Sequence, residues 1–243
     1  MLWLLIIPLG VAAGTLGGVV GFGSSVMLMP VLVAAFGPKE AVQIMALASL
    51  MANASRVAVW WREVDWRVNA VYCATAVPAA AIGARLLIGL DGRMVEAVLG
   101  VFLLATIPAR RWLAARGITI GLVGLAIVGA CIGFLTGLVA TTGPINTPFF
   151  LAYGLVKGAF IATEAVGAGA ISLTKALVFQ QSAVLPVEAV VRGLAVGSSL
   201  MLGSWLAKRI VLSFDPAQFR LLLEGMMLLA GLAMIWGAIM SPA

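Results

Sequence analysis

The stretch GFGSSVMLMP, Gly21 to Pro30, interrupts an apolar run that begins at Met1. Two glycines and two adjacent serines stand where a membrane helix would continue, and a proline closes the segment. Backbone that is not helical cannot face lipid, because each unpaired N–H or C=O group there costs several kcal/mol. The break must therefore be buried in protein or line a cavity, and the helix that follows it decides the fold.

The composition indicates an integral membrane protein. Of the 243 residues, 63% are apolar and only 10% are charged, and the mean hydropathy is +1.16, whereas about 25% of the residues of a soluble domain are charged. A spanning helix needs about 20 apolar residues, so the length allows roughly eight to ten helices. Because arginines and lysines sit mostly in short loops beside hydrophobic runs, the net charge of +6 indicates cytoplasmic anchoring rather than nucleic-acid binding.

The residues with reactive side chains indicate no catalytic or metal site. Cys73 and Cys131 lie inside apolar segments without CxxC spacing, and the chain has no histidine. We interpret both cysteines as packing residues, and we expect no disulfide, zinc site or cofactor. Paired acids and HExxH or GxSxG arrangements are also missing from the sequence, so we expect no enzyme activity.

Charge, proline and glycine divide the sequence into ten helical pieces. We expect the first five at 2–21, 24–36, 40–61, 68–89 and 94–109, followed by a basic connector at 109–117. We expect the second five at 118–139, 143–155, 159–182, 187–208 and 217–240. The first piece lacks a positive start, so we interpret it as a mature helix rather than a signal peptide. The pieces 24–36 and 143–155 would be only about 20 Å long, too short to cross a membrane, and are predicted to be half-helices.

The two halves of the chain resemble each other. Gly21–Val42 aligns with Leu138–Phe160, which pairs Pro30 with Pro148. This predicts two repeats, residues 1–117 and 118–243, that form one all-α, polytopic transmembrane domain. Each repeat would contain a hairpin with a broken, short helix and three spans. Because five pieces is an odd number, the second repeat starts from the opposite side, and the repeats are predicted to be inverted.

The positive charges predict the orientation. If the 62–67 loop is cytoplasmic, the 109–117 connector, Lys157 and the 208–216 loop are cytoplasmic as well. The other side then holds only Lys39, Arg93 and Arg192. This bias places both termini outside the cell.

The two breaks predict the charge of the ligand. In both repeats the Gly/Ser/Thr segment precedes the short helix, so free N–H groups and the positive end of the helix dipole face the break and attract anions. Hydroxyls add donors, and glycines permit close backbone approach. The substrate-binding residues predicted at the breaks are Gly23, Ser24, Ser25, Thr141, Thr142, Gly143 and Asn146. The alternative is that these small residues serve close helix packing, as we expect for Gly10 with Gly14 and Gly117 with Gly121.

Polar residues in the third piece of each repeat form a second constellation. Asn53 and Arg56 lie three apart on one helical face, and Ser172 and Lys175 occupy comparable places in the second repeat. An intramembrane charge is costly and indicates a functional site, so we add Asn53, Arg56 and Lys175 to the predicted anion contacts. For Arg56 and Lys175 the alternative is that the side chain reaches the lipid headgroups.

Carboxylates are scarce in the spans. Glu164 and Glu224 fall within the first two turns of helices that start in the cytoplasm. A solvated or ion-paired helix end is the favoured interpretation for both, and a coupling proton site is the alternative. Without histidine, a histidine proton relay is excluded.

Several of these motifs resemble the sulfite exporter TauE/SafE family of bacterial membrane proteins. The Gly-rich break before a proline, in GFGSSVMLMP and again in ATTGPINTP (Ala140–Pro148), resembles the duplicated signature of that family. WWREVDWR (Trp60–Arg67) is similar to its basic loop, and AVPAAAIGARL (Ala76–Leu86) to the small-residue helix that follows. The family usually has more glycine at the first break, where this chain has Ser24 and Ser25. It often has G-T-S where this chain reads Gln43–Met45 and Gly167–Gly169, which leaves the exact substrate open.

The resemblance implies export of sulfur-containing oxyanions, such as sulfite or small organosulfonates, across a bacterial inner membrane. We therefore expect a multi-pass secondary transporter with a midplane anion site and alternating access. Its expected partners are the small anion and membrane lipid, with a homodimer as an open possibility and no nucleic acid. The alternative function is a cation transporter or channel built on the same broken helices. The scarcity of midplane Asp and Glu argues against that alternative.

Overall fold

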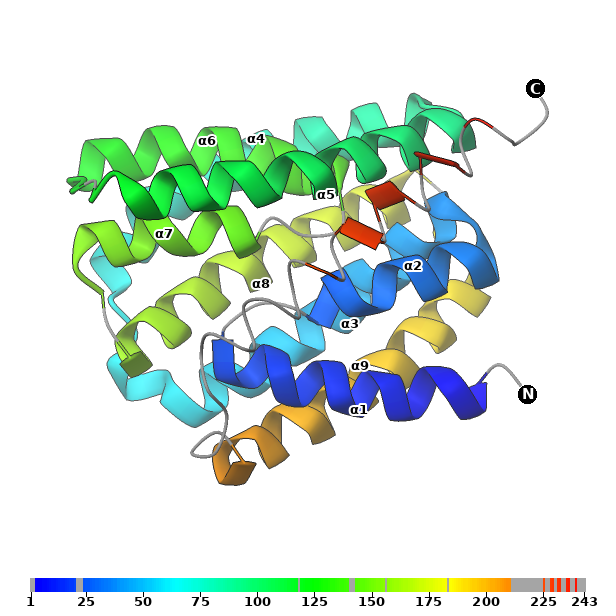
Figure 1. Cartoon of the computed structure of the whole chain (residues 1–243), viewed down its shortest axis with the longest axis horizontal. Helices are drawn as coiled ribbons and strands as arrows, with labels where there is room; N and C mark the ends of the chain where they lie inside the picture. Colours follow the sequence, from blue (N-terminus) through cyan, green and yellow to red (C-terminus); the bar gives the residue numbers. More distant parts are fainter. Residues whose placement is uncertain are drawn as a thin grey trace.

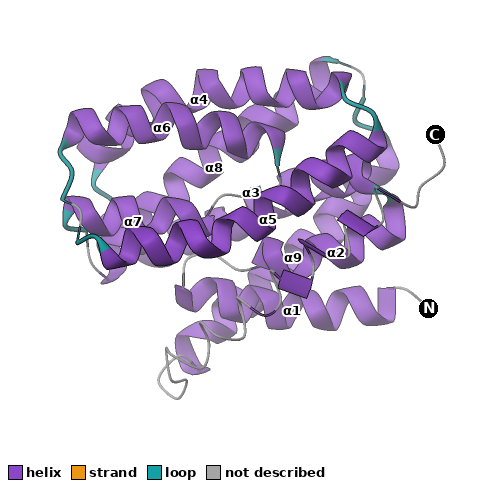
Figure 2. Ribbon diagram, turned by 45° about the horizontal axis from the view of Figure 1, so that its top comes forward, coloured by secondary structure: helices purple, strands orange, loops and turns teal. Residues whose placement is uncertain are grey.

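The computed structural model is a bundle of long helices that lie roughly along one axis (Figure 1). It describes residues 3–20, 24–117, 119–139, 143–155, 157–182 and 184–210, with single positions 225, 228, 229, 231, 232, 235, 236 and 239. The helices are α1 (Trp3–Val20), α2 (Ser24–Phe36), α3 (Pro38–Trp60), the 3₁₀ turn η1 (Trp61–Glu63), α4 (Trp66–Gly89), α5 (Gly92–Ala115), α6 (Leu122–Leu138), α7 (Gly143–Tyr153), α8 (Lys157–Gln181) and α9 (Val187–Ile210). No strand occurs among these residues, so the all-α prediction is confirmed (Figure 2).

Most helix boundaries agree with the sequence, and α5 is the exception. The expected connector 109–117 is helical through Ala115. The arginines in this segment stand among alanine, leucine and tryptophan, which favour or tolerate a helix. The helix ends instead at Gly117, whose φ of 55° is readily adopted only by glycine. The expected helix 217–240 lies largely outside the described residues.

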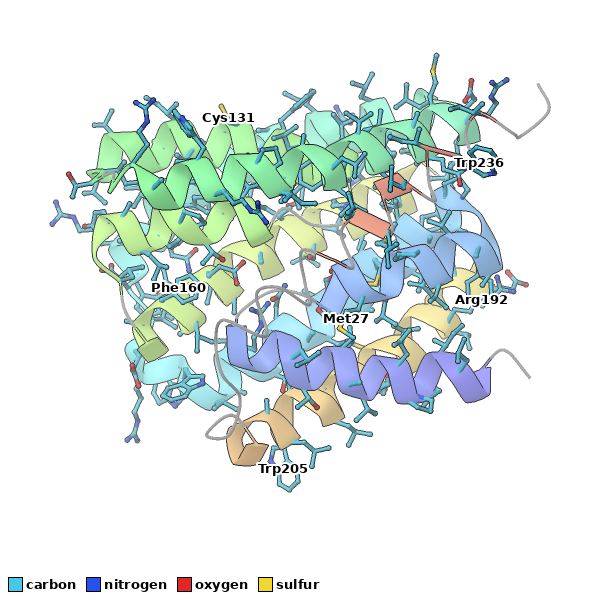
Figure 3. The ribbon with its side chains drawn as sticks, in the orientation of Figure 1. Met27, Cys131, Phe160, Arg192, Trp205 and Trp236 are labelled. Atoms are coloured by element: carbon cyan, nitrogen blue, oxygen red, sulfur yellow. The ribbon has the colours of Figure 1, made fainter. Side chains whose placement is uncertain are left out.

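Five described helices are long and apolar enough to span a bilayer. They cover Pro38–Glu63, Trp66–Gly89, Gly92–Ala109, Gly158–Gln181 and Val187–Ala207. Large apolar side chains on their outer faces are exposed, among them Ile82, Leu194 and Trp205. Figure 3 shows Trp205 and Cys131 pointing away from the bundle, on opposite sides. Cys131 is exposed, so its interpretation as an internal packing residue is wrong, because that face of α6 looks outward. The chain is a multi-pass membrane protein.

The two half-helices are confirmed. α2 has 13 residues and α7 has 11, or about 20 Å and about 17 Å at 1.5 Å per residue. Each is followed by a glycine with positive φ, Gly37 at 80° and Gly154 at 107°. Glycine is the residue that adopts this backbone conformation without strain, so both half-helices end by the same device.

The half-helices point in opposite directions. Both begin near the middle of the bundle, and α2 runs to one end while α7 runs to the other (Figure 1). At the end of α2, the Arg192 guanidinium lies 4.5 Å from the Phe36 ring and pairs with Glu40. At the end of α7, the Ile120 amide donates to the Ala152 carbonyl at 3.2 Å. Glu63 of η1 lies against Gly158, so the 62–67 loop and Lys157, which the charge count assigned to one side of the membrane, share one end of the bundle.

The fourth helix of each half packs against the other half. α4 packs along α6, and α9 packs along α1. A Cβ built on Gly133 would lie 2.3 Å from the Ala76 carbonyl oxygen, and one on Gly14 would lie 2.3 Å from the Leu200 carbonyl oxygen. These glycines let the helix backbones touch, which confirms packing at Gly10 and Gly14. The packing interpretation of Gly117 and Gly121 is wrong, because no atom lies within 4 Å of a Cβ at either position.

Candidate functional site

The first half of the candidate site surrounds the ammonium of Lys175 on α8. Lys175 is 1% exposed, and its Nζ donates to the Thr136 carbonyl at 2.8 Å and to the Val139 carbonyl at 2.6 Å. Both carbonyls belong to the end of α6, where the helix dipole is negative and a cation is stabilised. The side chain is thus held inside the bundle at the second break. This position excludes the alternative in which Lys175 reaches the headgroups.

The second half of the site is a buried polar network. Arg56 of α3 donates from Nη1 to Glu164 Oε2 on α8 at 3.1 Å, and a second guanidinium nitrogen donates to Asn53 Oδ1. Asn53 and Glu164 are each 3% exposed and Arg56 is 12% exposed. Arg56 therefore points into the bundle, and the headgroup alternative is excluded for it as well. For Glu164 the sequence predicted a solvated or ion-paired helix end. It is ion-paired, but it is not solvated.

The network continues into the second half-helix. Asn146 on α7 is buried, hydrogen-bonds to Glu164, and accepts from the Tyr72 hydroxyl of α4 at 3.2 Å. The Tyr72 ring meets Phe150 edge to face, with 5.0 Å between centroids. Side chains from α3, α4, α7 and α8 are thereby joined in one chain of contacts. Within it, the Arg56 guanidinium and the Glu164 carboxylate pair with each other, so each of these charged groups has a hydrogen-bond partner.

The start of α7 lies between the two halves of the site. Along the chain, Val139 is held by Lys175, Gly143 begins α7, and Asn146 enters the network with Glu164. Along the chain, the start of α7 therefore lies between the residue whose carbonyl binds the Lys175 ammonium and the residue that joins the network of Glu164 and Arg56.

The structure brings some of the predicted site residues together and leaves others apart. It joins Asn53, Arg56 and Asn146 in one network and sets Lys175 at the second break. Ser24 and Ser25 begin α2, and Ser25 is 4% exposed. Gly143 begins α7. Gly23, Thr141, Thr142 and Glu224 lie outside the described residues.

Sequence reasoning missed three polar groups of this region. Tyr72 completes the network, and Asn69, one turn before it on α4, donates to the Thr163 carbonyl at 3.2 Å. Asn69 and Tyr72 are three positions apart, so they share a helix face in a span of mostly small and apolar residues. That spacing could have indicated a polar cluster. The Ser49 hydroxyl, one turn before Asn53 on α3, is buried without a hydrogen-bond partner.

Removing the Tyr72 hydroxyl tests whether the network stabilises the fold. Tyr72→Phe keeps the ring contact with Phe150 and leaves the Asn146 oxygen without this donor, so we expect a loss of about 1–2 kcal/mol. Thermal unfolding in detergent measures it. Tyr153→Phe, at the half-buried end of α7, is the matched control and should change stability by under about 0.5 kcal/mol. Equal melting temperatures for the two variants would contradict the network.

Comparison with known proteins agrees with this architecture. The family model described as Sulfite exporter TauE/SafE matches residues 6–234. No curated protein and no solved structure matches the chain. The match extends from α1 past the last described helix and includes both breaks and the whole polar network, so the chain belongs to the sulfite exporter TauE/SafE family.

Proposed function

We propose that this chain is a secondary transporter that exports sulfur-containing oxyanions, sulfite or small organosulfonates, by alternating access at a site near the middle of the membrane. The observation that carries the proposal is Lys175. Its side chain is 1% exposed, and its ammonium lies at the end of α6, just before the second break, where two neutral carbonyls hold it. Burying a charge is costly unless a counter-charge compensates it, and an anionic substrate supplies that counter-charge.

The balance of buried charge favours an anion over a cation. Among the described residues, the charged side chains that lie inside the bundle are Arg56, Lys175 and Glu164. Glu164 is already paired with Arg56, so one positive charge remains for the ligand. A cation transporter needs the opposite balance, and the cation alternative is disfavoured for that reason.

Hydrogen-bond donors near these charges suit an oxyanion. The first turn of α7 offers free amides, and Asn53 and the unpaired Ser49 hydroxyl lie on the α3 face that carries Arg56. Sulfite and sulfonates each present three oxygens that accept such bonds. The three oxygens distinguish them from halides, which lack directional acceptors.

The path of the chain supports inverted repeats. α2 and α7 run from the middle of the bundle to opposite ends, and their following helices α3 and α8 also run in opposite directions. The contacts of α4 with α6 match those of α9 with α1, as a two-fold relation between the halves would require. Alternating access by rocking one bundle against the other is the usual mechanism of such repeats.

Uptake of radiolabelled sulfite and methanesulfonate into reconstituted vesicles tests this function. We expect saturable uptake of each anion and competition between the two. Vesicles without the protein give the background, and a known anion transporter shows that the assay works. Failure to move either anion above background would contradict the proposal.

A further inference from the structure

The Arg56–Glu164 pair contains a carboxylate, and an anion site has no need of a second negative charge. Glu164 is a buried carboxylate, 3% exposed, and the groups that face it are Arg56 from α3, Tyr72 from α4 and Asn146 from α7. Two further carboxylates lie at this end. The Asp65 amide donates to the Thr163 hydroxyl at 2.9 Å while its carboxylate accepts from the Val68 amide, and Glu63 of η1 lies against Gly158, more than a turn away on α8. Among these groups, Arg56 is the cation paired with Glu164.

An incoming oxyanion competes with Glu164 for Arg56. The guanidinium binds carboxylates and sulfonates through the same pairs of N–H groups, so the two ligands compete for the groups that now hold Glu164. Once the oxyanion holds Arg56, an ionised Glu164 would be a buried charge without a paired cation, because Lys175, 11 positions along α8, donates to the carbonyls at the end of α6. Leaving one member of a buried pair uncompensated costs several kcal/mol.

A proton on Glu164 removes that cost. The proton comes from water and forms an O–H bond with the carboxylate as the oxyanion takes Arg56, so the buried charge of the pair plus ligand stays balanced. When the oxyanion leaves, Glu164 returns the proton to water and pairs with Arg56 again. No bond within the substrate forms or breaks.

We propose that Glu164 is the coupling site of the transporter and that one proton crosses the membrane with each singly charged oxyanion bound at Arg56. This inference rests on the proposed function, since it names the ion that accompanies the same substrate. Because the linkage is reciprocal, a proton on Glu164 favours oxyanion binding to the same extent that the oxyanion favours protonation. Acid on the side that holds the oxyanion therefore accelerates its transport.

Methanesulfonate in reconstituted vesicles separates coupling from transport, because its own charge is constant near neutral pH. Two fluxes are measured: net uptake with an acidic outer solution, and exchange of labelled for unlabelled methanesulfonate at equal pH. For the wild type we expect both, with acid raising net uptake about tenfold, within the usual range of a coupling between two ligands. For Glu164→Gln we expect the ratio of net uptake with and without acid to fall to about one, whatever the size of its exchange flux.

Glu40→Gln is the matched control. Glu40 is also a carboxylate of the bundle paired with an arginine, Arg192, but it lies at the membrane end and is 26% exposed. It should keep the full response to acid. A Glu164→Gln protein whose net uptake still responds to acid would overturn the inference, as would wild-type net uptake that is indifferent to the pH difference. In both cases the proposed function stands. Absence of any flux in the wild type would overturn both.

If Glu164→Gln does not fold, the wild type provides a second measurement. Adding methanesulfonate to the purified protein in weakly buffered detergent should take up protons from the solution, seen with a pH-sensitive dye. Binding without proton uptake would overturn the inference.

Discussion

Replacing Lys175 with methionine is expected to lower oxyanion transport about a hundredfold while the folded protein keeps nearly its full stability. Methionine retains an unbranched side chain and removes the ammonium. Truncating one partner of a buried charge pair costs about 2–5 kcal/mol of binding, and about 3 kcal/mol corresponds to a hundredfold in affinity. Stability changes little because two effects oppose each other. The variant loses two hydrogen bonds to α6, and it no longer buries a charge held only by neutral carbonyls.

Two further variants make this result specific. Lys39→Met removes an exposed lysine at the start of α3 and should transport like the wild type. Lys175→Arg keeps the positive charge, and it should recover part of the activity that methionine loses. Uptake of sulfite and methanesulfonate is measured together with thermal unfolding for all three proteins. If the methionine variant transports normally, Lys175 serves only to fasten the end of α6, and the anion site lies elsewhere.

The breaks were predictable because they depend on local chemistry. A serine or glycine segment followed within a turn or two by proline marks a helix start wherever it occurs, and both half-helices begin where that pattern placed them, at Ser24 and Gly143. The end of α5 was misjudged because arginines were taken as a boundary. Charge at the edge of a membrane does not stop a helix, whereas the left-handed backbone at Gly117 does.

The partners of the buried charges could not be predicted, because they are set by packing between helices distant in the chain. Arg56 and Glu164 are 108 positions apart, and their pairing depends on how α3 crosses α8. The sequence alone suggested that Glu164, early in its helix, would be solvated or ion-paired at the helix end. Its burial follows from Tyr72 and Asn146, which α4 and α7 bring over it. Sequence pattern therefore identified the residues that carry charge, and the fold decided which of them neutralise each other.

A single methyl group on Gly133 is expected to destabilise the folded protein by about 3 kcal/mol, among the largest effects of any one-atom change in this chain. The Cβ of Gly133→Ala would lie 2.3 Å from the Ala76 carbonyl oxygen and 2.6 Å from the Ala76 Cα. Both are backbone atoms, so no side chain can move aside and α6 must shift away from α4. That shift would also pull on the end of α6 that Lys175 holds. Thermal unfolding in detergent measures the loss.

Gly14→Ala tests the same contact in the other half of the chain. Its Cβ would lie 2.3 Å from the Leu200 carbonyl oxygen and 2.7 Å from the Leu200 Cα, so we expect a loss of the same size. Gly89→Ala is the matched control, because no atom lies within 4 Å of a Cβ there and alanine favours the helix. If Gly133→Ala and Gly89→Ala unfold at the same temperature, the contact between α4 and α6 is not close. Equal losses at Gly14 and Gly133 would instead show that α1 with α9 and α4 with α6 depend on equally close backbone contacts.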